Sequence, residues 1–248
     1  MRGGAANPVR LRYSKRGKVR WISHRDVARA LERAFRITQL PLAFTEGFSP
    51  RPKVSFGLAL STGHESDAEY IDLVLADDVD VEMLSVSLTE ALPEGMAVTG
   101  AVPLQERAPA LQEAVTAVVW RVEPVAADGA PIDASLLAAH IARALELPAL
   151  PTSKRRKGRE VEEDVLPYIR RCELRETNPV SVEMELTTQP RSAKPGDILA
   201  GIARATDVPG GLVEAQVLRT HQWIERDGTR LDPLEADTRP RALEARAS

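Results

Sequence analysis

The segment "VTAVVWRVEP" (residues 115–124) shows where the fold divides into two parts. From this segment on, the chain repeats an order of strands and helices that the preceding residues already contain. Its run of apolar, β-branched residues predicts a strand. The elements expected after it are a helix over 133–147, strands over 165–174 and 180–188, a helix over 194–206 and a strand over 212–224. This half of the chain therefore reads β-α-β-β-α-β.

The residues before this segment give a similar order. The expected elements are short strands over 9–13 and 19–23, a helix over 23–39, strands over 42–46, 53–60 and 69–76, a helix over 80–92 and a strand over 96–104. In the ferredoxin-like split βαβ arrangement, two helices cover one face of an antiparallel sheet. The sequence therefore predicts an α+β fold of two tandem ferredoxin-like (βαββαβ) units with antiparallel sheets.

The domain boundaries follow from this repeat. We expect a basic first unit over 1–106, a linker over 107–114, a second unit over 115–224 and a flexible tail over 225–248. The tail is assigned because its residues mix charge, proline and alanine without an apolar period.

Composition sets the class of protein. The 248 residues are 43% hydrophobic and 28% charged, as in soluble globular proteins. No apolar run approaches the roughly 18 residues that cross a membrane, and the N-terminal residues lack the apolar core of a secretory signal. Cys172 is the only cysteine, which excludes an internal disulfide framework or a cluster held by several thiolates. We expect a cytoplasmic protein with no membrane partner, no metal and no cofactor.

The net charge of −3 conceals two opposed blocks. Residues 1–60 carry thirteen Lys and Arg against three acids, whereas residues 61–110 carry eleven acids against one Arg. Such asymmetry is typical of a polyanion-binding surface. The alternative is that the two blocks pair with each other in the fold.

The first predicted helix carries a row of cations. At about 100° per residue, its four arginines fall in one sector opposite an apolar face. The row consists of Arg25, Arg29, Arg33 and Arg36. Only Glu32 lies near it, whereas solvated helix faces usually interleave acids with bases. We therefore favour a phosphate-binding role over an ordinary solvated face.

The turn "FTEGFSPRPKVSFG" (residues 44–57) holds three of the four phenylalanines. Pro50 and Pro52 stiffen this turn. Phe48 is a candidate to stack on a base, with Arg51 and Lys53 on the neighbouring phosphates; its burial in the core is the alternative. Phe44 and Phe56 lie in strand-like patterns and are expected in the core.

A second basic cluster lies in a predicted exposed loop. It consists of Lys154, Arg155, Arg156 and Lys157. Runs of this kind are typical of nucleic-acid patches, but the acids that follow offer local neutralisation as an alternative.

Two other functions remain open. His24, His64 and Glu69 are candidates for an acid–base site in an RNA-processing enzyme centred on His24, or for a metal site. None of them belongs to a tight motif, and His24 at a helix start is also suited to bind phosphate. The third possibility is a protein-interaction scaffold that uses the acidic segment 65–82.

Residues 21–75, "WISHRDVARALERAFRITQLPLAFTEGFSPRPKVSFGLALSTGHESDAEYIDLVL", resemble the opening region of the radical-SAM-associated protein family of unknown function. The motifs that carry the resemblance are Ser23–Asp26, Arg29–Ala34, Gly47–Pro52, Ser55–Phe56 and Gly63–Tyr70. The later half matches more loosely, and Asp164–Pro167 depart from the family's Asp-Leu-Arg-Pro-like pattern.

The resemblance implies a module fused to, or encoded beside, a cobalamin-binding radical SAM protein, with links to ribonuclease E/G and the ribosome. Cluster ligation needs several cysteines, so this chain is not itself the radical SAM catalyst. We therefore expect an RNA-binding accessory protein rather than a standalone enzyme. We expect it to bind tRNA or rRNA and to work with a separate radical SAM enzyme. The RNA-binding residues expected in the first unit are Arg20, His24, Arg25, Arg29, Arg33, Phe48, Arg51 and Lys53.

Overall fold

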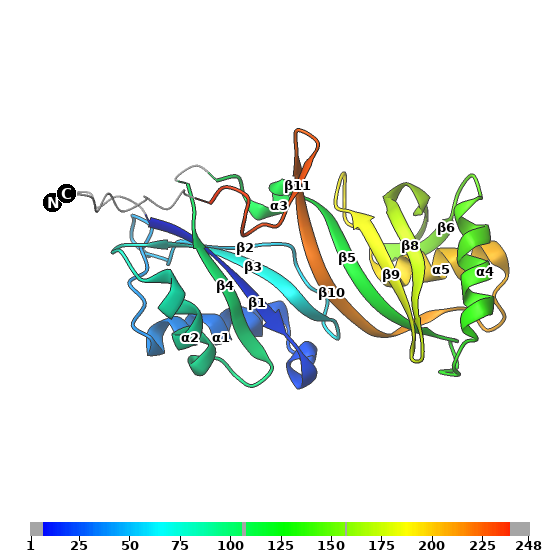
Figure 1. Cartoon of the computed structure of the whole chain (residues 1–248), viewed down its shortest axis with the longest axis horizontal. Coiled ribbons are helices and arrows are strands. Elements are labelled where there is room, and N and C mark those ends of the chain that lie inside the picture. The colour runs from blue at the N-terminus through cyan, green and yellow to red at the C-terminus, as the bar shows by residue number, and fades with distance from the viewer. Residues whose placement is uncertain (1–6, 106–107, 157, 239–248) are drawn as a thin grey trace, which may run out of the picture. The chain divides into compact units, whose positions relative to one another are not determined.

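The structure is a computed structural model that describes residues 7–105, 108–156 and 158–238. The chain divides into two units (Figure 1). Within the described residues, unit 1 comprises 7–62, 67–105, 108–114 and 224–238, and unit 2 comprises 63–66 and 115–223 without residue 157. In the described part of the chain, no helix is long and apolar enough to span a membrane.

Unit 1 packs two helices on a sheet. Its elements are β1 (Asn7–Lys15), the 3-10 helix η1 (Gly17–Trp21), α1 (His24–Ile37), β2 (Val54–Phe56), β3 (Glu65–Leu75), whose first two residues belong to unit 2, α2 (Val81–Ala91), β4 (Met96–Pro103) and α3 (Leu111–Ala114). The strand order is β4-β1-β3, with β2 paired to β3. The β1–β4 and β2–β3 pairs are antiparallel. Figure 1 shows α1 and α2 on the same face of this sheet.

The start of helix α1 and its buried face are set by its N-terminal cap and by the spacing of its apolar residues. The Ser23 side chain accepts a hydrogen bond from the Asp26 backbone N–H at the N-terminus. Val27, Leu31 and Phe35 repeat every four residues and are buried against Leu11, Ile71 and other sheet residues of one apolar core. This packing fixes which face of α1 meets the solvent.

Unit 2 repeats this plan with an added hairpin. Its elements are β5 (Val115–Val125), α4 (Ala134–Leu145), β6 (Pro151–Arg156), β7 (Arg159–Asp164), η2 (Leu166–Tyr168), β8 (Ile169–Thr177), β9 (Val180–Thr187), α5 (Pro195–Thr206) and β10 (Val213–Arg226), whose last residues belong to unit 1. The strand order is β10-β5-β9-β8, and β6 pairs only with β7 among the described strands. The β5–β9 and β8–β9 pairs are antiparallel, while Leu218 and Arg219 pair in parallel with Glu65 and Ser66. The predicted α+β class is confirmed. The sheets were predicted to be antiparallel, whereas the observed pairing is mixed, mainly antiparallel with a parallel pair between β3 and β10.

Several predicted strands are wrong or shortened. The strand predicted over 19–23 does not form, and residues 17–21 form η1 instead. The buried Lys15 ammonium donates hydrogen bonds to the carbonyl oxygens of Arg20 and Ile22 and holds the chain in a turn. Of the strand predicted over 53–60, only Val54–Phe56 forms. The strand predicted over 42–46 is reduced to isolated bridges, Leu42 to Leu75 and Phe44 to Pro52.

The expected flexible tail also differs from the structure. Residues 225–231 complete β10 and add β11 (Thr229–Leu231), which pairs with it. The Arg226 guanidinium then holds the Asp237 carboxylate at 2.5 Å. The sequence of this segment shows no apolar period, because strand pairing and an ion pair hold it in place rather than a buried apolar face. Residues 239–248 lie outside the described part of the chain, as do residues 106 and 107, where the first boundary was predicted.

Candidate nucleic-acid interface

Two cations on or next to strand β1 are paired with the acidic block. Arg12 on the same strand pairs instead with Asp232, outside that block. The side chain of Arg10 is fully buried and forms two hydrogen bonds to Asp72, and Arg16 pairs with Asp67 on the same strand, β3. Lys15 is also buried; desolvation lowers its pKa, and the nearby Glu69 carboxylate opposes that shift. The alternative that the two charge blocks pair is therefore confirmed for Arg10 and Arg16.

The arginine row on α1 is different. Arg25, Arg29, Arg33 and Arg36 are all exposed. Asp26 lies 3.2 Å from Arg29, and its pKa is lowered by the Ser23 hydrogen bond and then by Arg29. Within the described residues, the other three guanidinium groups have no ion pair or hydrogen bond. The row therefore presents a surplus of positive charge to the solvent.

The turn that contains Phe48 is an irregular hairpin anchored on β3. Lys53 N–H donates to the Ala43 carbonyl at 2.8 Å, and Ala43 N–H donates to the Val74 carbonyl at 2.8 Å. Near the tip, Thr45 N–H donates to the Arg51 carbonyl at 2.9 Å. Phe48 lies at the tip and is fully exposed, as the stacking hypothesis requires.

Two exposed aromatic residues were missed by the sequence analysis. Phe44 was expected in the core, but 55% of its surface is exposed, because the strand that would have buried it is reduced to a bridge with Pro52. Trp21 is 64% exposed at the end of η1, and the Arg20 guanidinium lies 5.2 Å from its ring centre. No pattern in the sequence distinguished an exposed Trp21 from a strand residue.

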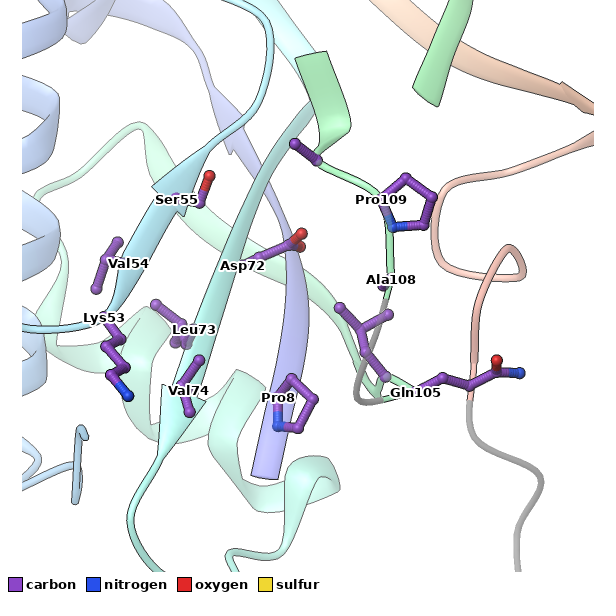
Figure 2. A pocket seen from close by; sticks show the side chains of 12 residues that line it. Pro8, Lys53, Val54, Ser55, Asp72, Leu73, Val74, Gln105, Ala108 and Pro109 are labelled. Atoms are coloured by element: carbon purple, nitrogen blue, oxygen red, sulfur yellow. The ribbon is translucent and has the colours of Figure 1, made fainter. Parts of the chain in front are cut away.

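The turn borders two hollows of unit 1. One, of about 420 Å³, opens between Lys53, Ser55 and Asp72 on one side and Gln105 and Pro109 on the other, as Figure 2 shows. Its carboxylate, that of Asp72, is already bonded to Arg10. The other hollow, of about 470 Å³, lies between the C-terminal part of α1 and the base of the turn.

The two candidate histidines, His24 and His64, lie in different units and contact different residues. His24 is exposed at the start of α1, and its ring meets Phe56 edge-on at 5.0 Å. His64 belongs to unit 2, where it is buried and its Nε2 lies 2.8 Å from Glu214. Glu69 is buried in unit 1. Among the described residues, no group of three or more His, Cys, Asp or Glu side chains is arranged to hold a metal ion.

The second basic cluster is not in a loop. Lys154, Arg155 and Arg156 lie in strand β6, which forms a hairpin with β7, and Lys157 lies outside the described residues. Two of the acids that follow pair elsewhere in unit 2, Glu162 with Arg204 at 2.8 Å and Glu163 with Arg191. The alternative of local neutralisation within the segment therefore gains no support from these two acids.

Three comparisons place the chain among known proteins. The model of an uncharacterized protein family conserved in bacteria, DUF2344, matches residues 9–195. No curated protein matches the sequence. The similar solved structures include a Cbf5–Nop10–Gar1 complex, at 12% identity and a TM-score of 0.45, covering 86% of this chain and 48% of that chain. The Nop10–Cbf5 complex of an archaeal box H/ACA sRNP follows, at 9% identity and 0.42, covering 86% and 46%.

A dye-decolorizing protein from V. cholerae is less similar still, at 8% identity and a TM-score of 0.20, covering 87% of this chain and 92% of that chain. This chain thus spans less than half the length of the first two solved chains. With TM-scores under 0.5, these likenesses carry no argument about function.

Proposed function

The chain belongs to the DUF2344 family of uncharacterized bacterial proteins, and we propose that it is an RNA-binding accessory protein that captures RNA on unit 1. The observation that carries the proposal is the division of the cations in that unit. Arg10 and Arg16 are paired with acids of β3. By contrast, Arg25, Arg33 and Arg36 on α1 have no acidic partner in the described residues. Phosphates of a nucleic acid would relieve the repulsion within this row.

Exposed aromatic side chains favour RNA with unpaired bases over a duplex. Proteins recognise single-stranded RNA by stacking its bases on aromatic rings, which a base-paired helix does not offer. Phe48 is fully exposed at the tip of its turn, and Arg51 and Lys53 are exposed beside it. The proposed phosphate-binding residues also include Arg20 and His24, at the end of η1 and the start of α1.

The partner enzyme is inferred from the family resemblance of residues 21–75. We propose that RNA held by this chain, either tRNA or rRNA, is presented to a separate radical SAM enzyme. The chain's own Cys172 is buried and is the only thiol, so the iron–sulfur chemistry belongs to the partner.

We also propose that each unit is ferredoxin-like, which gives unit 1 a rigid platform for the site. The strand orders β4-β1-β3-β2 and β10-β5-β9-β8 support this, because they place the first and third strands of each βαββαβ order in the centre. In unit 2, the β6–β7 hairpin is then an insertion. A second proposed RNA contact consists of Lys154, Arg155 and Arg156 on this hairpin, together with Lys157, which lies outside the described residues.

The test is a fluorescence-anisotropy titration of a labelled single-stranded RNA over a range of salt concentrations. We expect binding whose logarithmic salt slope becomes shallower by about 0.7 when Arg33→Ala removes one phosphate contact. Arg175→Ala is the matched control, because Arg175 is an exposed arginine of unit 2 outside the proposed site. An Arg33→Ala variant with unchanged affinity and slope would contradict the proposal, as would binding that does not depend on salt.

A further inference from the structure

The hollow of about 470 Å³ beside α1 combines an apolar lining with three polar side chains at its rim. Its volume lies within the roughly 300–1,000 Å³ of small-ligand sites. The apolar part includes Leu40, Leu42 and Phe44, and the polar side chains are Glu32, Arg36 and Gln39. All belong to unit 1 and lie next to the arginine row.

We propose that this pocket receives one unpaired base of the bound RNA and prefers a base with an exocyclic amino group to uracil. The inference rests on the proposed function, because it names what the RNA-binding surface recognises. The occupant follows from the chemistry of the rim: an aromatic ring for a base, a cation for its phosphate and a carboxylate for its amino group.

Phe44 supplies the stacking surface. More than half of this side chain is exposed, although its backbone is fixed by the bridge to Pro52 and by the hydrogen bonds of the neighbouring Ala43. A ring held in this way loses little conformational entropy when a base stacks on it. Arg36 lies in the same pocket and is exposed, so its guanidinium is placed to contact the phosphate of the inserted nucleotide.

Glu32 supplies the preference among bases. An ionised carboxylate only accepts hydrogen bonds, so it favours the exocyclic amino groups of adenine, cytosine and guanine. Uracil offers it only the ring N3–H, which lies between two carbonyl oxygens that repel a carboxylate. Within the described residues, the Glu32 side chain has no hydrogen bond or ion pair and is exposed. Gln39 follows α1 with a left-handed backbone (φ 51°) and brings an amide that both donates and accepts.

The test compares twelve-residue uridine oligonucleotides that carry a single central A, C, G or U. At fixed salt, we expect the wild-type protein to bind the three amino-bearing oligonucleotides about tenfold more tightly than the all-uridine one, by anisotropy. Glu32→Gln should bring this ratio close to one, because glutamine also donates to a carbonyl. The ratio is compared rather than the affinity, since losing a negative charge strengthens all RNA binding. Glu90→Gln, an exposed acid on α2, is the control and should leave the ratio unchanged.

Phe44 is tested in the same series. Phe44→Ala should weaken binding of the adenine oligonucleotide about tenfold without changing the salt slope, and Phe44→Trp should retain binding. A wild-type ratio near one, or RNA binding that neither Glu32→Gln nor Phe44→Ala alters, would overturn the pocket inference and leave the proposed function intact. Failure of the wild-type protein to bind any of the oligonucleotides would instead overturn the proposed function itself.

Discussion

Asp72 holds the guanidinium group of Arg10 through two parallel hydrogen bonds, 2.7 Å from Nε and 2.9 Å from Nη2. Arg10 is buried within unit 1, and its Nη1 also donates to the carbonyl of Pro233 at 3.0 Å. One cation of the basic block is thus neutralised inside the fold and is not available to bind phosphate. This pair marks the difference between cations that stabilise unit 1 and those on α1 that face solvent.

Removing the charge of Asp72 should therefore destabilise the protein strongly. In Asp72→Asn, the buried Arg10 loses its counter-charge, and breaking a buried pair costs about 3–5 kcal/mol of unfolding free energy. Urea unfolding followed by circular dichroism measures the change. Asp67→Asn is the control, because its pair with Arg16 is about 40% exposed and should contribute only about 0–1 kcal/mol. Equal losses in the two variants would contradict this distinction.

The sequence predicted the elements whose apolar period is long, and missed those held by polar contacts. Helix α1 and the exposure of its arginines followed from spacing alone, since Val27, Leu31 and Phe35 leave only one face for the core. The η1 turn could not be predicted, because it depends on Lys15 reaching two carbonyl groups. The exposure of Phe44 depends likewise on where β2 stops, which tertiary pairing decides.

Phe48 is expected to contribute to RNA binding and not to stability. Phe48→Ala should weaken binding of single-stranded RNA by about 1–3 kcal/mol, because one stacked base is lost, with the salt slope unchanged. The melting temperature should also stay the same, since the side chain is fully exposed. Anisotropy and thermal unfolding measure the two effects, and Phe48→Trp should keep the affinity. Wild-type affinity in Phe48→Ala would remove Phe48 from the site.

Cys172 is expected to be unreactive in the folded protein. Burial raises the pKa of its thiol from 9.0 to about 12, so the thiolate that reacts with alkylating agents hardly forms at neutral pH. Iodoacetamide labelling followed by mass spectrometry should show modification only in urea.

The same shift gives a sign for the pH dependence of stability. The folded state keeps the proton more tightly than the unfolded state, so this contribution is fully present below about pH 9 and is lost as the pH rises toward 12. Cys172→Ala should therefore lose less unfolding free energy than the wild type between pH 8 and pH 11. Rapid labelling of the native protein at pH 7, or a steeper alkaline loss in the variant, would contradict the assignment.

His24 and His64 are expected to behave differently, because one is exposed and the other is buried. His64→Ala should lower the unfolding free energy by about 1–3 kcal/mol, since the Glu214 carboxylate loses its hydrogen-bond partner, and should leave RNA affinity unchanged. His24→Ala should weaken RNA binding and leave stability unchanged. Thermal unfolding and anisotropy separate these outcomes. RNA cleavage that either substitution abolishes, with binding kept, would favour the acid–base alternative.

Trp21 should report RNA binding through its fluorescence. Of the three tryptophans, Trp120 is buried and Trp223 is half-buried, whereas Trp21 is 64% exposed and lies in unit 1 beside Arg20. A nucleic acid bound along η1 and α1 should stack on this ring or cover it, so titration with single-stranded RNA should quench the emission. Trp21→Phe should remove the quenching and keep most of the affinity, because a phenyl ring still stacks. Quenching of the same size in Trp21→Phe would assign all of it to the other two tryptophans, both in unit 2, and would contradict RNA binding beside Trp21.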